Sequence, residues 1–193
     1  MILQKLLKNY KMMKKAAFIL TILCALVSGV AFGQAQATLN VKLYPIQTIV
    51  IGGNNTVNLE YKTKDNYLNG VTSDMKDHLV VYSTGGFAVK VKSENEDLVY
   101  TKDALISKIA ANTINLQAKL GTDNKLNLST MKNVVLSNEN QNLISSTVGG
   151  TELKFNVAYN GKGGNDYVNK YYNVETPNVN VYTTAVTYTI EAQ

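Results

Sequence analysis

From about residue 38 onward, the chain is a succession of short segments in which apolar and polar residues alternate, separated by glycine, asparagine and aspartate. A period of two residues is the pattern of a β-strand with one buried face. The clearest examples are Ile114–Leu120, Leu153–Tyr159 and the closing stretch Tyr182–Ile190. About nine such segments, without a regular alternation of strands and helices, predict an all-β fold: a single antiparallel Ig-like β-sandwich.

Turn-forming residues divide the first half of this region into further strands. Ile46–Ile51 follows Pro45, which predicts an edge strand or a break in a strand. Val57–Tyr61 is expected as the next strand, before a turn at Asn69-Gly70. The stretches 78–82 and 87–91 are predicted to form a hairpin around a Thr-Gly-Gly turn at 84–86.

The middle of the chain is less distinct. Apolar residues between Asp103 and Ala111 have helical spacing, but the stretch is too short to decide between one or two helical turns and a strand. Val134–Leu136 and Leu143–Val148 are expected as further strands, joined by a turn-prone connection rich in asparagine.

Residues 1–37 have the different pattern of a secretory signal peptide. Five lysines precede an apolar run from Ala16 to about Gly33, and small residues at 35–37 suit cleavage by a signal peptidase. The run is also long enough for a retained membrane anchor, although the small residues after it favour cleavage. We therefore expect a cleaved leader at 1–37 and one β-sandwich domain at 38–193, exported to the periplasm, the cell surface or a fimbrium.

Removal of the leader changes the charge balance. All 19 basic residues of the chain are lysines, and the leader holds five of them and no acid. The remaining 14 lysines face 14 acids, so the predicted mature chain is neutral. Arginine, the residue best suited to phosphate and guanine contacts, is absent, which disfavours nucleic-acid binding. The single cysteine, Cys24, lies in the leader, so the domain depends on its core and not on disulfides.

Candidate catalytic chemistry is scarce in this sequence. The single histidine, His78, has no cysteine or second histidine to complete a metal site or triad, and is expected at a turn or strand edge. Ser129 and Lys132 match the S-x-x-K string of serine acylating enzymes, but the companion motifs are missing. The loop Asn160–Asp166 offers oxygen ligands for calcium without the order of an EF-hand. We predict no enzyme activity, no catalytic or metal-binding residue and no cofactor.

Tyrosine is the residue type that suggests a binding surface. The chain has 12 tyrosines and no tryptophan, and a tyrosine ring offers both an apolar face and a hydroxyl to a sugar or a protein. Tyr167, Tyr171 and Tyr172 form a local cluster that predicts one such face. Tyrosine is also simply a favourable strand residue, and this structural interpretation is the stronger one.

The two ends of the predicted domain suggest how it acts. Leu39, Val41 and Leu43 alternate with polar residues at its start, and a closing strand presents a matching row of Tyr182, Val186, Tyr188 and Ile190. With its leader and cysteine-free body, the chain resembles the pilin-like subunits of bacterial surface fibres, including chaperone-usher pilins and spore coat U-type domains. It departs from them in lacking their common cysteine pair, and Tyr188 lies further from the terminus than their penultimate tyrosine.

The resemblance implies an assembly mechanism. In such subunits an N-terminal extension fills the incomplete sandwich of the next subunit by strand addition. The donor here would be Thr38–Leu43 within an extension spanning 38–44, and the partners would be copies of itself or related subunits, together with a periplasmic chaperone. The alternative is that 38–44 forms the first strand of a complete sandwich.

The sequence therefore predicts an exported, non-enzymatic structural subunit of a bacterial surface fibre or fimbria. The alternative function is a secreted or periplasmic module that binds a glycan such as peptidoglycan.

Overall fold

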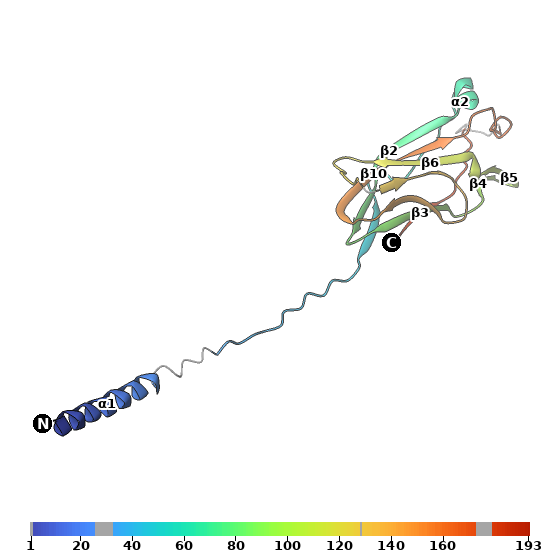
Figure 1. Cartoon of the computed structure of the whole chain (residues 1–193). Helices are drawn as coiled ribbons and strands as arrows, with labels where there is room; N and C mark the ends of the chain where they lie inside the picture. The colour runs from blue at the N-terminus through green and yellow to red at the C-terminus, as the bar shows by residue number, and fades with distance from the viewer. Residues whose placement is uncertain (1, 26–32, 128, 173–178) are drawn as a thin grey trace. The chain divides into compact units, whose positions relative to one another are not determined.

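A computed structural model of the chain describes residues 2–25, 33–127, 129–172 and 179–193. It divides into two compact units, Met1–Lys42 and Leu43–Gln193. The first unit contains α1 (Ile2–Ala25), which ends within the expected leader (Figure 1). None of the helices that the structure describes is both long enough and apolar enough to cross a membrane.

The second unit is mostly β-structure, and its larger sheet has five antiparallel strands. Their order across the sheet is β1-β2-β10-β6-β8. The strands are β1 (Gln47–Ile51), β2 (Val71–Ser83), β6 (Ile114–Leu120), β8 (Asn133–Val135) and β10 (Gly150–Gly161). β2 and β10 share the longest ladder, from Gly150↔Ser83 to Gly161↔Val71.

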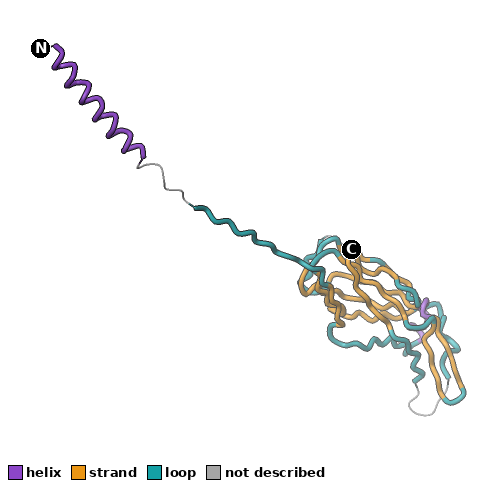
Figure 2. The backbone as a smooth tube through the Cα atoms, turned by 90° about the horizontal axis from the view of Figure 1, so that it is seen from below, coloured by secondary structure: helices purple, strands orange, loops and turns teal. Residues whose placement is uncertain are grey.

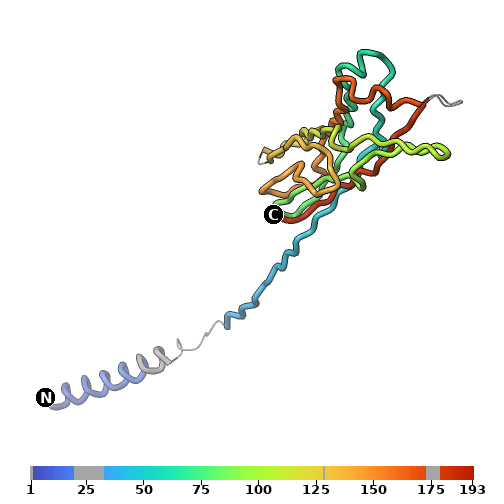
Figure 3. Tube along the Cα trace, turned by 90° about the vertical axis from the view of Figure 1, so that its right-hand side faces the viewer, coloured from blue at the N-terminus to red at the C-terminus, as the bar shows by residue number. Residues whose placement is uncertain are grey.

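A second sheet has four antiparallel strands in the order β11-β3-β9-β7. These are β3 (Phe87–Ser93), β7 (Ser129–Met131), β9 (Gln141–Ser146) and β11 (Val186–Ala192). The strands β4 (Asp97–Lys102) and β5 (Leu105–Ala110) form a separate hairpin, which projects beside the two sheets (Figures 1 and 3). The short elements α2 (Lys64–Asn69) and η1 (Ala111–Thr113) complete the described secondary structure, coloured by type in Figure 2.

One hydrophobic core joins the two larger sheets. Leu79 and Phe155 from the five-stranded sheet and Phe87 and Val89 from the four-stranded sheet are all fully buried in the same cluster. The rings of Phe87 and Phe155 meet edge to face, with their centroids 6.4 Å apart. In these strands the inward apolar positions of the alternating segments pack this core, as a period of two requires.

The expected all-β body is confirmed at the level of antiparallel sheets, but the predicted 78–82/87–91 hairpin is wrong. β2 and β3 belong to different sheets, and the Thr84-Gly85-Gly86 connection carries the chain from one sheet to the other. Two strands paired side by side and two strands facing each other across a core have the same alternation. The pattern and the turn residues cannot distinguish these arrangements.

Three other local predictions have mixed outcomes. Residues 57–61 lie outside the strands, although Val57 and Leu59 still pack against the core. The Asn69-Gly70 turn exists as the end of α2, where Gly70 has a φ of 83°. The stretch between Asp103 and Ala111, left open between helix and strand, forms β5 and the beginning of η1.

The strand predicted at the start of the domain is also absent. Residues 33–46 lie outside the strands, and the first strand of the unit is β1 at Gln47. Leu39, Val41 and Leu43 therefore do not form the first strand of this body, as the alternative interpretation required.

Candidate functional site

The segment Thr38–Leu43 has the composition of a strand but no secondary structure. Leu39 and Leu43 are each 89% exposed and Val41 is 77% exposed. Lys42 is its one charged residue. Apolar side chains in strict alternation are stabilised by a second strand and a surface that covers them, and here they have neither.

The closing stretch alternates as predicted, but it pairs with two different elements. Tyr182 lies before β11, and its neighbour Thr183 exchanges two backbone hydrogen bonds of 3.1 Å with Val99 of β4. From Val186 onward the chain pairs with β3 (Figure 3). Val186, Tyr188 and Ile190 are half-buried and pack against the core, which places this row on the inward face.

The hydrogen bonds at the two ends of β11 show which of its backbone groups point away from β3. The Ala185 carbonyl accepts a 2.8 Å bond from the Glu94 N–H, and the Gln193 N–H donates a 3.0 Å bond to the Gly86 carbonyl. In an antiparallel pair, alternate residues bond to the same neighbour. Odd-numbered residues therefore bond to β3, and Val186, Tyr188 and Ile190 direct their backbone N–H and C=O groups to the open edge.

β1 presents a second open edge of the same kind. The Gly52 N–H donates to the His78 carbonyl at 2.8 Å, and the Thr84 N–H donates to the Ile46 carbonyl at 3.0 Å. The even-numbered positions thus bond to β2, which leaves the backbone groups of the odd-numbered residues 47, 49 and 51 on the open edge. β1 and β11 have Cα atoms within 8 Å of one another, so the two open edges lie on the same side of the body.

A buried polar chain joins the two sheets behind these edges. His78 Nε2 lies 3.0 Å from the Tyr159 hydroxyl, which lies 2.5 Å from the Tyr188 hydroxyl. His78 is 2% exposed, and its Nδ1 has no hydrogen-bond partner among the described residues. Burial lowers the pKa of His78, and burial raises the pKa of Tyr159 to about 12. Burial also raises the pKa of Tyr188, helped by the neighbouring Tyr159.

The expectation that His78 lies at a turn or strand edge is wrong, because a bulge turns it inward. β2 lies between β1 and β10, and its pairing with β10 shifts register between Phe155 and Val157. Asp77 at this point has a φ of 49°, and its N–H is held by Asn156 Oδ1 at 2.7 Å. The bulge buries two consecutive residues, His78 and Leu79, which regular alternation does not allow.

Two of the three tyrosines predicted to form a glycan-binding face, Tyr167 and Tyr172, lie in different clusters. The Tyr167 ring meets that of Tyr61 at 4.8 Å, and its hydroxyl lies 2.6 Å from Thr113 Oγ1. Tyr172 instead lies near Tyr100, with its hydroxyl 3.3 Å from Ser107 Oγ. The Tyr182 hydroxyl also donates to Ser107 Oγ, at 2.9 Å.

Tyr171 is 49% exposed. The rings and hydroxyls of Tyr167 and Tyr172 are largely used within the protein, which weakens the case for a shared sugar-binding surface.

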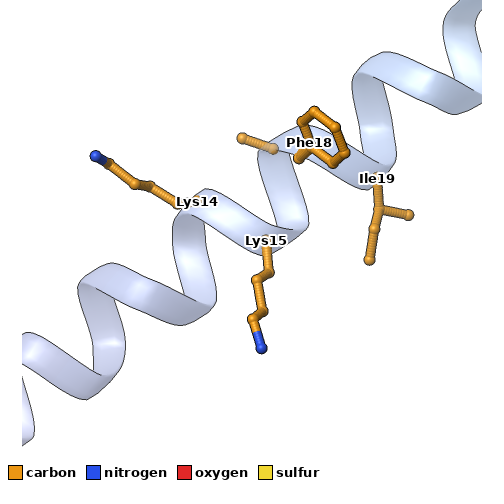
Figure 4. Close-up of a pocket in the computed structure, with 5 residues that line it drawn as sticks. Lys14, Lys15, Phe18 and Ile19 are labelled. Atoms are coloured by element: carbon orange, nitrogen blue, oxygen red, sulfur yellow. The ribbon is translucent and has the colours of Figure 1, made fainter.

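Hollows on the described surface offer little to a ligand. One is lined by Lys14, Lys15, Ala17, Phe18 and Ile19, which all project from α1 (Figure 4). A second lies over β2, β6 and β10 and has Ala158 among its lining residues. Neither contains a buried, unpaired polar group.

The structure describes no candidate metal centre. No group of three or more His, Cys, Asp or Glu side chains in the described part of the chain could hold a metal ion. In the loop considered for calcium, the Asp166 carboxylate pairs with Lys162 Nζ at 2.5 Å. The hydrogen bond to Asp166 raises the pKa of Lys162.

Comparison of the chain with known proteins adds no family assignment, because no family model and no curated protein matches it. The candidate site therefore rests on the described geometry. Sequence reasoning identified the exposed N-terminal row and the closing strand. It missed the open edge of β1 and the histidine-tyrosine chain, which depend on register and on a bulge.

Proposed function

We propose that this protein is an exported structural subunit of a bacterial surface fibre, assembled by β-strand addition. In this proposal the five- and four-stranded sheets form an Ig-like sandwich, and residues 1–37 direct export. Thr38–Leu43 of one subunit adds as a strand to an open edge of the next. The supporting observation is a row of alternating apolar side chains that is exposed and lies outside the described strands.

The free energies involved indicate that assembly needs all three apolar side chains of this row. Burial of three aliphatic side chains contributes about 1.5–3 kcal/mol each, and each backbone hydrogen bond of the added strand contributes about 1 kcal/mol. Association of two proteins costs about 4–15 kcal/mol in lost motional freedom. The gain and the cost are comparable, so the loss of one apolar contact should be enough to weaken assembly measurably.

The glycan-binding alternative has less support. Of the three tyrosines on which it depended, Tyr167 and Tyr172 have their hydroxyls directed at Thr113 and Ser107. A sugar-binding platform needs ring faces and hydroxyls that remain available to the ligand.

Two matched substitutions in the full chain test the proposal. Val41→Lys places a charge in the apolar row, whereas Asn40→Lys places the same charge on the opposite face of the same segment. We expect the first variant to be a folded monomer by light scattering and circular dichroism, and the second to assemble like the unaltered chain. Equal assembly of both variants would contradict strand addition through this row.

A further inference from the structure

The open edges of the described sheets differ in length. β7 and β8 span three residues each, which is too short to pair fully with the six residues of Thr38–Leu43. β1 and β11 span five and seven residues. β5, on the outer side of the projecting hairpin, spans six. β4 also spans six residues, but its outer edge already bonds to Thr183 through Val99. This leaves three edges for a six-residue partner.

The three edges differ in the charged side chains that they carry. Glu191 of β11 pairs with Lys90 at 2.6 Å, and Lys108 of β5 pairs with Asp97 at 3.1 Å. Charged side chains on an edge strand discourage the addition of another strand. β1 has the sequence Gln-Thr-Ile-Val-Ile, with no charge and three β-branched aliphatic residues. It is the edge that has the least protection against pairing.

The surroundings of β1 are apolar as well. On the face of β1 and β2 that points away from the core, Ile46 is 52% exposed, Val50 is 58% exposed and Tyr82 is 40% exposed. Ile51 is 40% exposed although its side chain alternates onto the inward face with Ile49. An added strand would cover the open flank of these inward side chains, which β1 leaves uncovered as an edge strand.

The residue spacing of the N-terminal segment also matches that of the open edge of β1. The free backbone groups of β1 belong to every second residue from Gln47 to Ile51, and Ile49 is the middle one. The apolar row of the N-terminal segment has the same spacing, with Val41 in the middle. When Val41 lies opposite Ile49, both aliphatic rows face the core side of the extended sheet.

We propose that the open edge of β1 receives Thr38–Leu43 of a second copy of this chain, with Val41 opposite Ile49. This inference rests on the proposed function and specifies its acceptor. The occupant is a copy of this chain because its exposed row matches the uncharged edge in spacing and character. β11 then lies beside the incoming strand and is not its hydrogen-bonding partner.

Engineered cysteines test the pairing directly. In a full chain carrying Cys24→Ser, no native thiol competes, because Cys24 is the one cysteine of the sequence. A tagged Val41→Cys chain is mixed with an untagged Ile49→Cys chain under mild oxidation, and the linked pair is measured on a non-reducing gel. Opposite residues of a hydrogen-bonded pair lie about 5.5 Å apart at Cα, within disulfide range.

The matched control replaces the acceptor with Ile190→Cys on the edge of β11. We expect Val41→Cys to link to Ile49→Cys at least tenfold faster than to Ile190→Cys. Faster linkage to Ile190→Cys would overturn the choice of β1 and leave strand addition intact. If the Val41→Cys donor links to neither acceptor faster than an Asn40→Cys donor does, both proposals are contradicted.

A second pair of variants blocks each edge in turn. Gln47→Pro removes a backbone N–H that β1 directs to its open edge, and Val186→Pro removes one that β11 directs to its open edge. We expect Gln47→Pro to remain folded and monomeric, and Val186→Pro to assemble. Assembly of both variants, or a concentration-independent link within single chains carrying both Val41→Cys and Ile49→Cys, would show that β1 does not accept a second copy.

Discussion

At the scale of single residues, the histidine-tyrosine chain links the two larger sheets. Tyr188 comes from β11 of the four-stranded sheet, whereas His78 and Tyr159 come from the five-stranded sheet. Their hydrogen bonds therefore tie the closing strand to the opposite sheet. In a low-dielectric core such a chain is stabilising while it is neutral, and costly when one member gains or loses a proton.

The first prediction concerns acid stability. Burial lowers the pKa of His78 in the folded state, so the unfolded chain takes up a proton first as the pH falls. Stability should therefore decrease below the ordinary histidine pKa of about 6.5, by up to about 1.4 kcal/mol per pH unit from this residue. Urea denaturation at pH 7.5 and pH 5.5 measures the effect, and His78→Gln should reduce the difference. An equal difference in both proteins would rule out His78 as the cause.

The second prediction concerns alkaline stability, which should decrease as the pH rises. The pKa of Tyr159 is raised from about 10 to about 12, so the unfolded chain loses its proton first as the pH rises. The stabilisation should be complete below pH 10 and should be lost between pH 10 and pH 12. Thermal unfolding across this range, compared between the unaltered chain and Tyr159→Phe, measures it. A matching alkaline loss in the variant would assign the effect to other groups.

Removal of one hydroxyl tests the link between the sheets. Tyr188→Phe deletes a hydroxyl 2.5 Å from that of Tyr159 while it retains the ring. We expect a loss of about 1 kcal/mol in the free energy of unfolding. Tyr44→Phe is the control, because Tyr44 is 71% exposed. If the two variants have the same stability, the chain of hydroxyls does not hold β11 in place.

At the scale of elements, the alternation of apolar and polar residues located most strands but did not show which strands pair with each other. It placed β6, β10 and β11 to within a few residues, because their inward positions pack one core. It could not show that β2 and β3 belong to different sheets, since facing strands and paired strands have the same pattern. It also misplaced His78, because the bulge at Asp77 interrupts the alternation and buries His78 next to Leu79, and no local residue pattern identifies that bulge.

The connections between the sheets give a prediction at this scale. A Cβ at Gly149 would lie 2.1 Å from the Ser83 carbonyl oxygen, whereas a Cβ at Gly85 would have open space. Gly149→Ala should therefore displace one connection and destabilise the fold by about 1–3 kcal/mol. Gly85→Ala should have little effect. Denaturant midpoints of the two variants provide the comparison, and equal midpoints would mean that the two connections are not closely packed.

At the scale of the whole molecule, the account depends on a segment that the body does not use for its own sheets. Thr38–Leu43 lies outside the strands, while the described sheets leave the edges of β1 and β11 open on one side of the body. A chain with an unpaired strand-like segment and an unprotected edge has the two complementary parts of a head-to-tail contact. Repetition of a head-to-tail contact produces a fibre when its rotation does not close into a ring.

The most direct test is the molar mass in solution of the full chain and of a chain that lacks Thr38–Leu43, measured by light scattering over a range of concentrations. The account predicts that the full chain grows in mass with concentration. The shortened chain should remain a monomer with unchanged β-sheet circular dichroism. A shortened chain that still assembles, or that fails to fold, would contradict the proposed role of this segment as a strand donated to another subunit.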